Sequence, residues 1–177
     1  MKNRNPLISH LRTSFCALVI VGALLALPRA EASGPPLPAN GEFFPCFNYA
    51  GLPRQVGDNL IITFNVTVTS TGTFPGSLTG TELRIIHRDG SETIEGSAVF
   101  TGSVTGRSGT GTLHLSFEGI GNAVTGHETL RVAGTRGTGA LSGVYLQLTA
   151  EGDVGAPSPG CALSGTGTYN GQVLFAP

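Results

Sequence analysis

A histidine and a glutamate are the residues of this chain best placed for acid–base chemistry. His87 follows Leu83 and Ile85 at two-residue intervals, and Glu128 precedes Leu130 by the same interval. Side chains two residues apart in a strand point to the same face. In a barrel, both polar groups would therefore share the apolar interior face, and the carboxylate could orient the imidazole. The pattern offers His87 and Glu128 as a candidate catalytic pair.

The same two residues also have a structural interpretation, which the local sequence favours. His87 directly precedes Arg-Asp-Gly at 88–90, a sequence typical of turns, and would then lie at the barrel rim. Glu128 would pair with an arginine at the barrel mouth. His114 and His127 have the opposite parity from their apolar neighbours and are predicted to face solvent.

Other signatures of chemistry are weak or missing from the sequence. The run Gly-Thr-Arg-Gly-Thr-Gly at 134–139 resembles a phosphate loop, but phosphate loops lead into a helix N-terminus. Its flanks are predicted strands, so a hairpin turn is the better interpretation. The nucleophile motif Gly-x-Ser-x-Gly does not occur. No histidine has a zinc-like spacing from Cys46 or Cys161, and no metal or other cofactor is predicted.

Aromatic residues on the predicted apolar faces point to a binding interior. These residues are Phe64, Phe100, Phe117 and Tyr169. If they line a barrel, they would form a pocket for a small apolar or amphipathic ligand. The alternative is a ligand-free interior packed by its own side chains, which a barrel of eight strands allows.

The beginning of the chain predicts export. Lys2, Arg4 and Arg12 precede an unbroken apolar run of 13 residues at 15–27, and Ala-Glu-Ala follows at 30–32. This is the pattern of a secretory signal peptide, and the run is too short to span a bilayer. We predict cleavage after Ala32, no stable membrane span afterwards, and a periplasmic or extracellular location. The alternative is an uncleaved anchor.

Removal of residues 1–32 changes the charge and cysteine content. The mature chain has six arginines, no lysine and ten acidic residues, a net charge near −4. It has no clustered basic surface, so nucleic acid is not expected as a partner. Cys46 and Cys161 remain, and an even pair in an oxidising compartment predicts a disulfide. Closing a loop of this length would contribute about 4–5 kcal/mol in the chain-entropy model.

The elements that must position these residues are strands. In 59–69, Leu60, Ile62, Phe64, Val66 and Val68 alternate with polar or opposite-facing residues, which indicates one buried face. Similar patterns occur at 81–88, 94–104, 112–118, 125–132, 144–150 and 163–175. No segment has apolar residues at helical spacing.

Seven or eight short strands with brief turns predict an antiparallel meander, closed into a barrel that hides its edges. Gly96, Gly102, Gly126 and Gly165 lie within strand patterns, where glycine permits bulges and sharp coiling. A β-sandwich is the alternative. The predicted organisation is a signal peptide at 1–32, a Pro-rich lead at 33–58 containing Cys46, and a barrel at 59–177.

The segment 95–143 resembles a family of small uncharacterised bacterial proteins. The similarity lies in Phe-Thr-Gly-Ser at 100–103, Gly-Arg-Ser-Gly at 106–109, and the glycine-rich hairpin ending in Ala-Leu-Ser-Gly at 140–143. The resemblance implies an allene-oxide-cyclase-like or dirigent-like β-barrel. It carries over no catalytic residues, and members of the family usually lack a signal peptide.

The sequence therefore predicts an exported β-barrel that binds a small apolar ligand. One alternative is an isomerase or cyclase that uses the barrel pocket with His87 and Glu128 as acid and base. A second is a ligand-free structural or inhibitory protein. The sequence does not decide whether the chain is an enzyme, although it favours a binding role, and it gives no oligomeric state.

Overall fold

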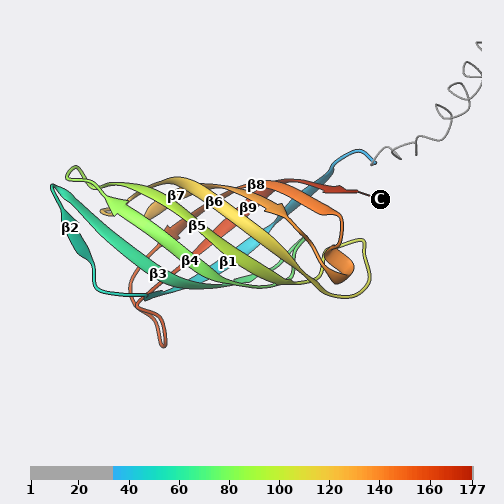
Figure 1. Ribbon diagram of the computed structural model, residues 1–177, viewed down its shortest axis with the longest axis horizontal. Coiled ribbons are helices and arrows are strands. Elements are labelled where there is room, and N and C mark those ends of the chain that lie inside the picture. Colours follow the sequence, from blue (N-terminus) through green and yellow to red (C-terminus); the bar gives the residue numbers. More distant parts are fainter. Residues whose placement is uncertain (1–33, 177) are drawn as a thin grey trace, which may run out of the picture. The chain divides into compact units, whose positions relative to one another are not determined.

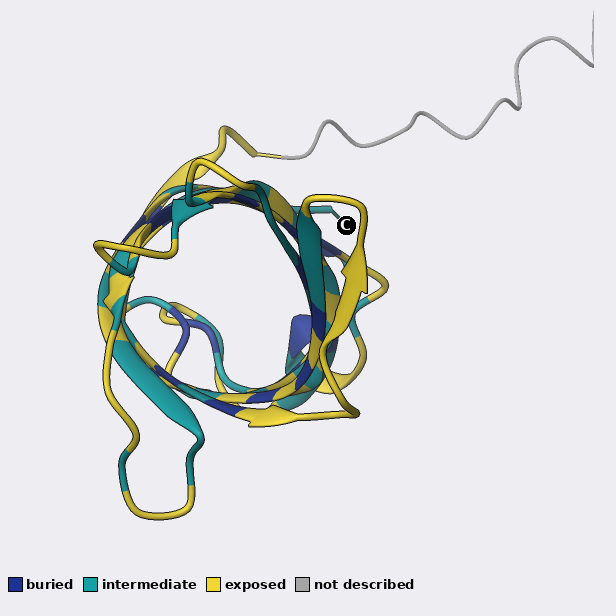
Figure 2. Cartoon of the chain, turned by 90° about the vertical axis from the view of Figure 1, so that its left-hand side faces the viewer, coloured by how far each residue is buried: buried dark blue, intermediate teal, exposed yellow. Residues whose placement is uncertain are grey.

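The described residues, 34–176 of a computed structural model, form a closed antiparallel β-barrel (Figures 1 and 2). The strands are β1 Leu37–Tyr49, β2 Arg54–Val56, β3 Asn59–Ser70, β4 Gly76–Ile86, β5 Ser91–Gly102, β6 Gly111–Asn122, β7 His127–Thr135, β8 Val144–Val154 and β9 Leu163–Phe175. A short 3-10 helix, η2, covers Gly139–Leu141. The predicted signal peptide lies outside the described residues. Within 34–176, no helix is long and apolar enough to cross a membrane.

Strand pairing follows the chain order and then closes on itself. From β3 to β9, each strand pairs with the next one in sequence, as hairpins. β1 closes the ring: its first half pairs with β9 and its second half with β3. β2 pairs only with the start of β3 and lies outside the ring as an extra strand. The predicted barrel is confirmed, and the sandwich alternative is wrong.

The strand that closes the barrel comes from the segment predicted to be a Pro-rich lead. The assignment of 33–58 to a region outside the barrel therefore needs correction, because residues 37–49 are β1. Pro38 and Pro45 conceal this strand in the sequence, since proline cannot donate a ladder hydrogen bond. Pro45 lies where the pairing with β9 is interrupted, between Phe43 and Cys46, so its missing N–H is tolerated.

Glycines let large side chains cross the barrel interior. A Cβ on Gly96 would collide with the ring of Phe117, and one on Gly167 would collide with the ring of Phe43. The inward glycines therefore act mainly by close approach, and they compensate for the aromatic residues on neighbouring strands. Gly126 differs, because it lies in the turn before β7 with a φ of +76°, which favours glycine.

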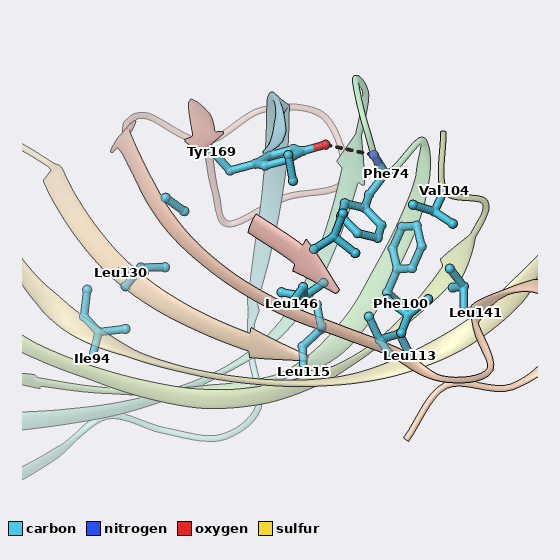
Figure 3. Packing of buried hydrophobic residues seen from close by; sticks show 14 residues of the cluster. Phe74, Ile94, Phe100, Val104, Leu113, Leu115, Leu130, Leu141, Leu146 and Tyr169 are labelled. Atoms are coloured by element: carbon cyan, nitrogen blue, oxygen red, sulfur yellow. Dashed lines mark hydrogen bonds between the residues drawn. The ribbon is translucent and has the colours of Figure 1, made fainter. Parts of the chain in front are cut away.

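The largest apolar cluster runs along the barrel interior, from Ile94 and Leu130 to the end at η2 (Figure 3). Leu113, Leu141 and Val104 are almost completely inaccessible to solvent there. Tyr169 on β9 reaches across β1 at Gly41 to the turn between β3 and β4. Its hydroxyl donates to the Thr71 carbonyl at 2.6 Å and accepts from the Phe74 amide at 3.0 Å. This end is thus closed by packing and by a satisfied polar group.

The predicted disulfide is present. Cys46 on β1 is bonded to Cys161, just before β9, with the two Cα atoms 5.3 Å apart and 115 positions apart in sequence. The pairing of β1 with β9 resumes at Cys46 and Ser164. The bridge therefore fastens the seam at which the ends of the barrel sheet meet, beside the break at Pro45.

We expect the double substitution Cys46→Ser and Cys161→Ser to lower the free energy of unfolding by about 2–4 kcal/mol, because the unfolded chain regains the freedom of a long loop. Urea denaturation of the variant and of the wild type, each with and without reductant, measures this. The reductant should lower the wild-type midpoint and leave that of the variant unchanged. Equal midpoints for the oxidised wild type and the variant would exclude a stabilising role.

Candidate functional site

The barrel interior contains a cavity of about 120 Å³. Most of its wall is apolar and comes from the inward faces of the strands. The aromatic part of the lining is Phe43, Phe47, Phe74, Phe100, Phe117 and Tyr169. Protein interiors contain few voids larger than a water molecule, so an internal space of this size is the first feature that suggests a binding site.

Three of the four residues predicted to line a pocket do so. Phe100, Phe117 and Tyr169 contribute to the cavity wall. Phe64 does not, although it is buried. It belongs to a second apolar cluster with Phe47, Ile62 and Val66, on the side of the barrel that β3 contributes.

A buried arginine and three buried glutamates lie at one end of the cavity. The Arg84 guanidinium donates from Nε to Glu82 Oε1 at 2.5 Å, from Nη2 to Glu128 Oε2 at 2.8 Å, and from Nη1 to Glu92 Oε2 at 3.4 Å. The exposed fraction of each of these side chains is 6% or less. We call these four residues the Arg84 cluster. Glu82 and Glu128 also line the cavity.

Strand register brings the cluster together. Glu82 and Arg84 are two residues apart on β4 and so share its inward face. Glu92 on β5 and Glu128 on β7 are both cross-strand partners of Gly121, which lies between them on β6. A Cβ on Gly121 would lie 2.7 Å from Glu92 Oε2. The missing side chain therefore leaves the space in which the carboxylates converge on one guanidinium.

Aromatic rings support the charged head of Arg84. Its guanidinium carbon lies 4.8 Å from the centre of the Phe47 ring and 5.8 Å from that of Phe64. A cation at these distances is attracted by the ring faces. The Arg84 guanidinium thus contacts carboxylates at its edge and aromatic rings at its face. Because the Phe64 ring packs against this guanidinium, it lies beside the cluster and does not line the cavity.

Burial makes the cluster electrostatically unusual. It raises the pKa of Glu82 to about 7, although Arg84 opposes the shift, and the negative charge of Glu128 adds to it. Burial likewise raises the pKa of Glu128. Burial alone would lower the pKa of Arg84, but the neighbouring carboxylates outweigh it and raise that pKa. Near neutral pH, Glu82 is therefore able to exchange a proton beside an apolar cavity.

The predicted acid–base residues are held by different partners. The ring nitrogens of His87 lie 3.1 Å from Asn59 Oδ1 and 3.1 Å from Thr93 Oγ1, at the end of β4. Glu128 instead pairs with Arg84 inside the barrel. The structure does not bring the two side chains into hydrogen-bond contact. A catalytic role for them stays a prediction, and the geometry agrees better with the structural interpretation of each.

The interior face of β4 is the reverse of the one inferred from its apolar residues. Leu83 and Ile85 suggested that odd-numbered residues face inwards. The buried residues are instead Glu82 and Arg84, and the odd-numbered positions are more accessible. Hydrophobic alternation was misleading in this strand because its inward positions are charged. Sequence reasoning therefore missed Glu82, Arg84 and Glu92 as site residues.

Comparison with known proteins bears on the fold. No family model and no curated protein sequence matches the chain. A similar solved structure is that of a protein of unknown function from the DUF3224 family of Shewanella oneidensis MR-1. The TM-score is 0.61 and the sequence identity 18%, over 81% of this chain and 99% of that one. At this sequence identity, the structural similarity shows only that the two proteins share a β-barrel fold. The resemblance to allene-oxide-cyclase-like or dirigent-like barrels stays a prediction.

The raised pKa of Glu82 makes the stability of the barrel depend on pH. A carboxyl whose pKa is higher in the folded than in the unfolded protein adds to the stability of the folded state at pH values below the unfolded-state pKa. This added stability is lost as the pH rises to the folded-state pKa. From pH 4.5 to about 7, the wild type should therefore lose free energy of unfolding relative to Glu82→Gln. The loss should be on the order of 3 kcal/mol.

Urea denaturation at several pH values measures this difference. Glu151→Gln, which removes the same charge from an exposed position on β8, is the matched control and should follow the wild-type pH profile. Parallel profiles for the wild type and Glu82→Gln would show that Glu82 has an ordinary pKa in the folded protein.

Proposed function

We propose that this chain is an exported protein that binds a small apolar or amphipathic molecule inside its barrel. The observation that carries the proposal is the apolar cavity of about 120 Å³ with Phe100, Phe117 and Tyr169 in its wall. An apolar cavity of roughly 150 Å³ in another protein stays dry and takes up benzene or xenon. The apolar part of such a cavity is a poor site for water and a good one for a compact apolar molecule.

The size of the cavity limits the ligand. Sites for drug-sized molecules are about 300–1,000 Å³, so the ligand proposed here has about six non-hydrogen atoms in the apolar part, by comparison with benzene. The cavity also favours binding over the alternative of a solidly packed interior. Ala98 on β5 lines it, where a larger residue would have filled part of the space.

The disulfide supports export. Disulfides persist in oxidising compartments and are rare in the cytosol, and the Cys46–Cys161 bridge staples the barrel seam. The disulfide and the signal-peptide pattern at 1–32 together favour a periplasmic or extracellular location for the protein.

Ligand binding is tested by NMR titration of the processed protein with xenon and with cyclopentanol. We expect chemical-shift changes at residues that line the cavity, and saturation of these changes. Ala98→Leu, which adds three carbons to the cavity wall, should weaken binding by at least about tenfold, because the space is filled. The matched control is Ala133→Leu on the outward face of β7, which should bind as the wild type does.

The absence of any saturable change in the wild type would overturn the binding proposal. So would unchanged affinity in Ala98→Leu, because the ligand would then bind elsewhere.

Export is tested by expressing the full chain in a secretion-competent bacterial host and measuring the intact mass of the product outside the cytoplasm. We expect a chain that begins at Ser33, with the mass of residues 33–177 less two hydrogens for the disulfide. Ala30→Arg together with Ala32→Arg should block this processing, because the signal peptidase site requires small residues. An intact full-length chain found only in the cytoplasm would contradict the proposal.

A further inference from the structure

The Arg84 cluster has more acidic groups than its one cation can balance. Glu82, Glu92 and Glu128 share the single guanidinium. His127, next to Glu128 in the sequence, is exposed and hydrogen-bonds to Asp153 on the outer surface. Fully ionised, the cluster would keep two surplus negative charges in a buried place. Such charge is costly unless a proton or another cation offsets it.

Glu82 and Glu128 each bind one nitrogen on the side of the Arg84 guanidinium that usually binds both oxygens of a single carboxylate. Nε and Nη2 form the side of a guanidinium that binds both oxygens of a carboxylate. Here Nε binds only Glu82 Oε1, and Nη2 binds only Glu128 Oε2. Among the described residues, Glu82 Oε2 and Glu128 Oε1 have no side-chain hydrogen-bond partner. Both side chains are 3% exposed, and both belong to the cavity wall.

We propose that the ligand of the cavity is a small apolar amine, whose protonated ammonium group binds between the unoccupied carboxylate oxygens of Glu82 and Glu128. The inference deepens the proposed function and rests on it. The apolar body of the ligand fills the space beside Phe100 and Phe117. The ammonium group donates to the two carboxylates and supplies the positive charge that the cluster lacks.

Other ligand chemistries fit the cluster less well. An anion would meet two surplus carboxylates at the wall. A neutral alcohol could hydrogen-bond to the same oxygens, but it would leave the surplus charge in place. An ammonium group offers three donors, and hydrogen bonds between charged partners are stronger than those between neutral ones. The cluster therefore selects for a cation on a compact apolar body.

Binding of the amine releases a proton where Glu82 is protonated. The ammonium ion displaces the proton of the Glu82 carboxyl, which passes to solvent, and the carboxylate that remains pairs with the ligand. Affinity for the amine should therefore rise between pH 6 and pH 8, while that for a neutral ligand stays constant. The charged groups facing Glu82 in this exchange are Arg84 on its own strand, Glu92 on β5 and Glu128 on β7.

The test is an NMR titration of the processed protein with cyclopentylamine, cyclopentanol and cyclopentanecarboxylate, which share one ring and differ in charge. At pH 8 we expect cyclopentylamine to bind at least about tenfold more tightly than cyclopentanol, and cyclopentanecarboxylate more weakly than either. Glu82→Gln and Glu128→Gln should each reduce the affinity for the amine towards that for the alcohol, and change the affinity for the alcohol little. Glu151→Gln should keep the wild-type preference.

The outcomes separate this inference from the proposed function. If xenon and cyclopentanol bind in the cavity but the amine has no advantage, the inference is overturned and the binding function stands. If the preference for the amine survives in both Glu82→Gln and Glu128→Gln, the ammonium group does not bind there and the inference is also overturned. If none of the probes binds, both proposals fail. Thermal denaturation of each variant first establishes that it is folded.

Discussion

The arrangement of this barrel depends on one arginine inside it. Arg84 is almost completely buried, and leaving its charge unpaired there would be strongly destabilising. Three strands therefore have to present carboxylates to it, and β3 and β1 have to present the rings of Phe64 and Phe47 to its face. Slipping β4 by one residue would turn Glu82 and Arg84 outwards and replace them by Leu83 and Ile85. The cluster thus fixes the register of β4 against its neighbours, a role that hydrophobic alternation has elsewhere in the sheet.

The cluster draws its partners from both sides of the pair β1–β3. Glu92, Gly121 and Glu128 lie side by side on β5, β6 and β7, while Phe47 comes from β1, on the far side of the closing pair β1–β3. A sheet opened between β1 and β3 would leave the guanidinium without its ring partner from β1. Closure depends in turn on the strand with Pro38 and Pro45, which the disulfide fastens beside the interruption at Pro45. The disulfide thus holds β1 against β9, and the contact of Phe47 with Arg84 holds β1 beside β3 and β4.

The sequence predicts the strands well where their inward residues are apolar. The alternation at 59–69 and the apolar positions of 144–150 correspond to β3 and β8, and the disulfide follows from two remaining cysteines. Prediction fails where charge or proline occupies the inward or paired positions. β1 contains two prolines, and β4 directs Glu82 and Arg84 inwards, so its apolar residues indicate the wrong face. Even so, the sequence correctly indicates that Glu128 faces inwards, because Leu130 and Val132 on its own strand are apolar. No local pattern could connect it with an arginine 44 residues earlier, since that contact depends on the register of four strands.

The cavity and the surplus charge adjoin each other, and folding alone explains neither. Atoms that line a void forgo dispersion contacts, and replacing buried ions by apolar residues of similar volume is often neutral or stabilising. Ala98 and Glu82 both line the cavity, and a barrel built only for stability would have a larger residue at Ala98 and an apolar one at Glu82. This chain instead combines a largely apolar space, two carboxylates with unoccupied oxygens, and a carboxyl with a pKa of about 7. Departures from local consistency of this kind concentrate at functional sites. For that reason the binding proposal treats the Arg84 cluster and the cavity as a single site.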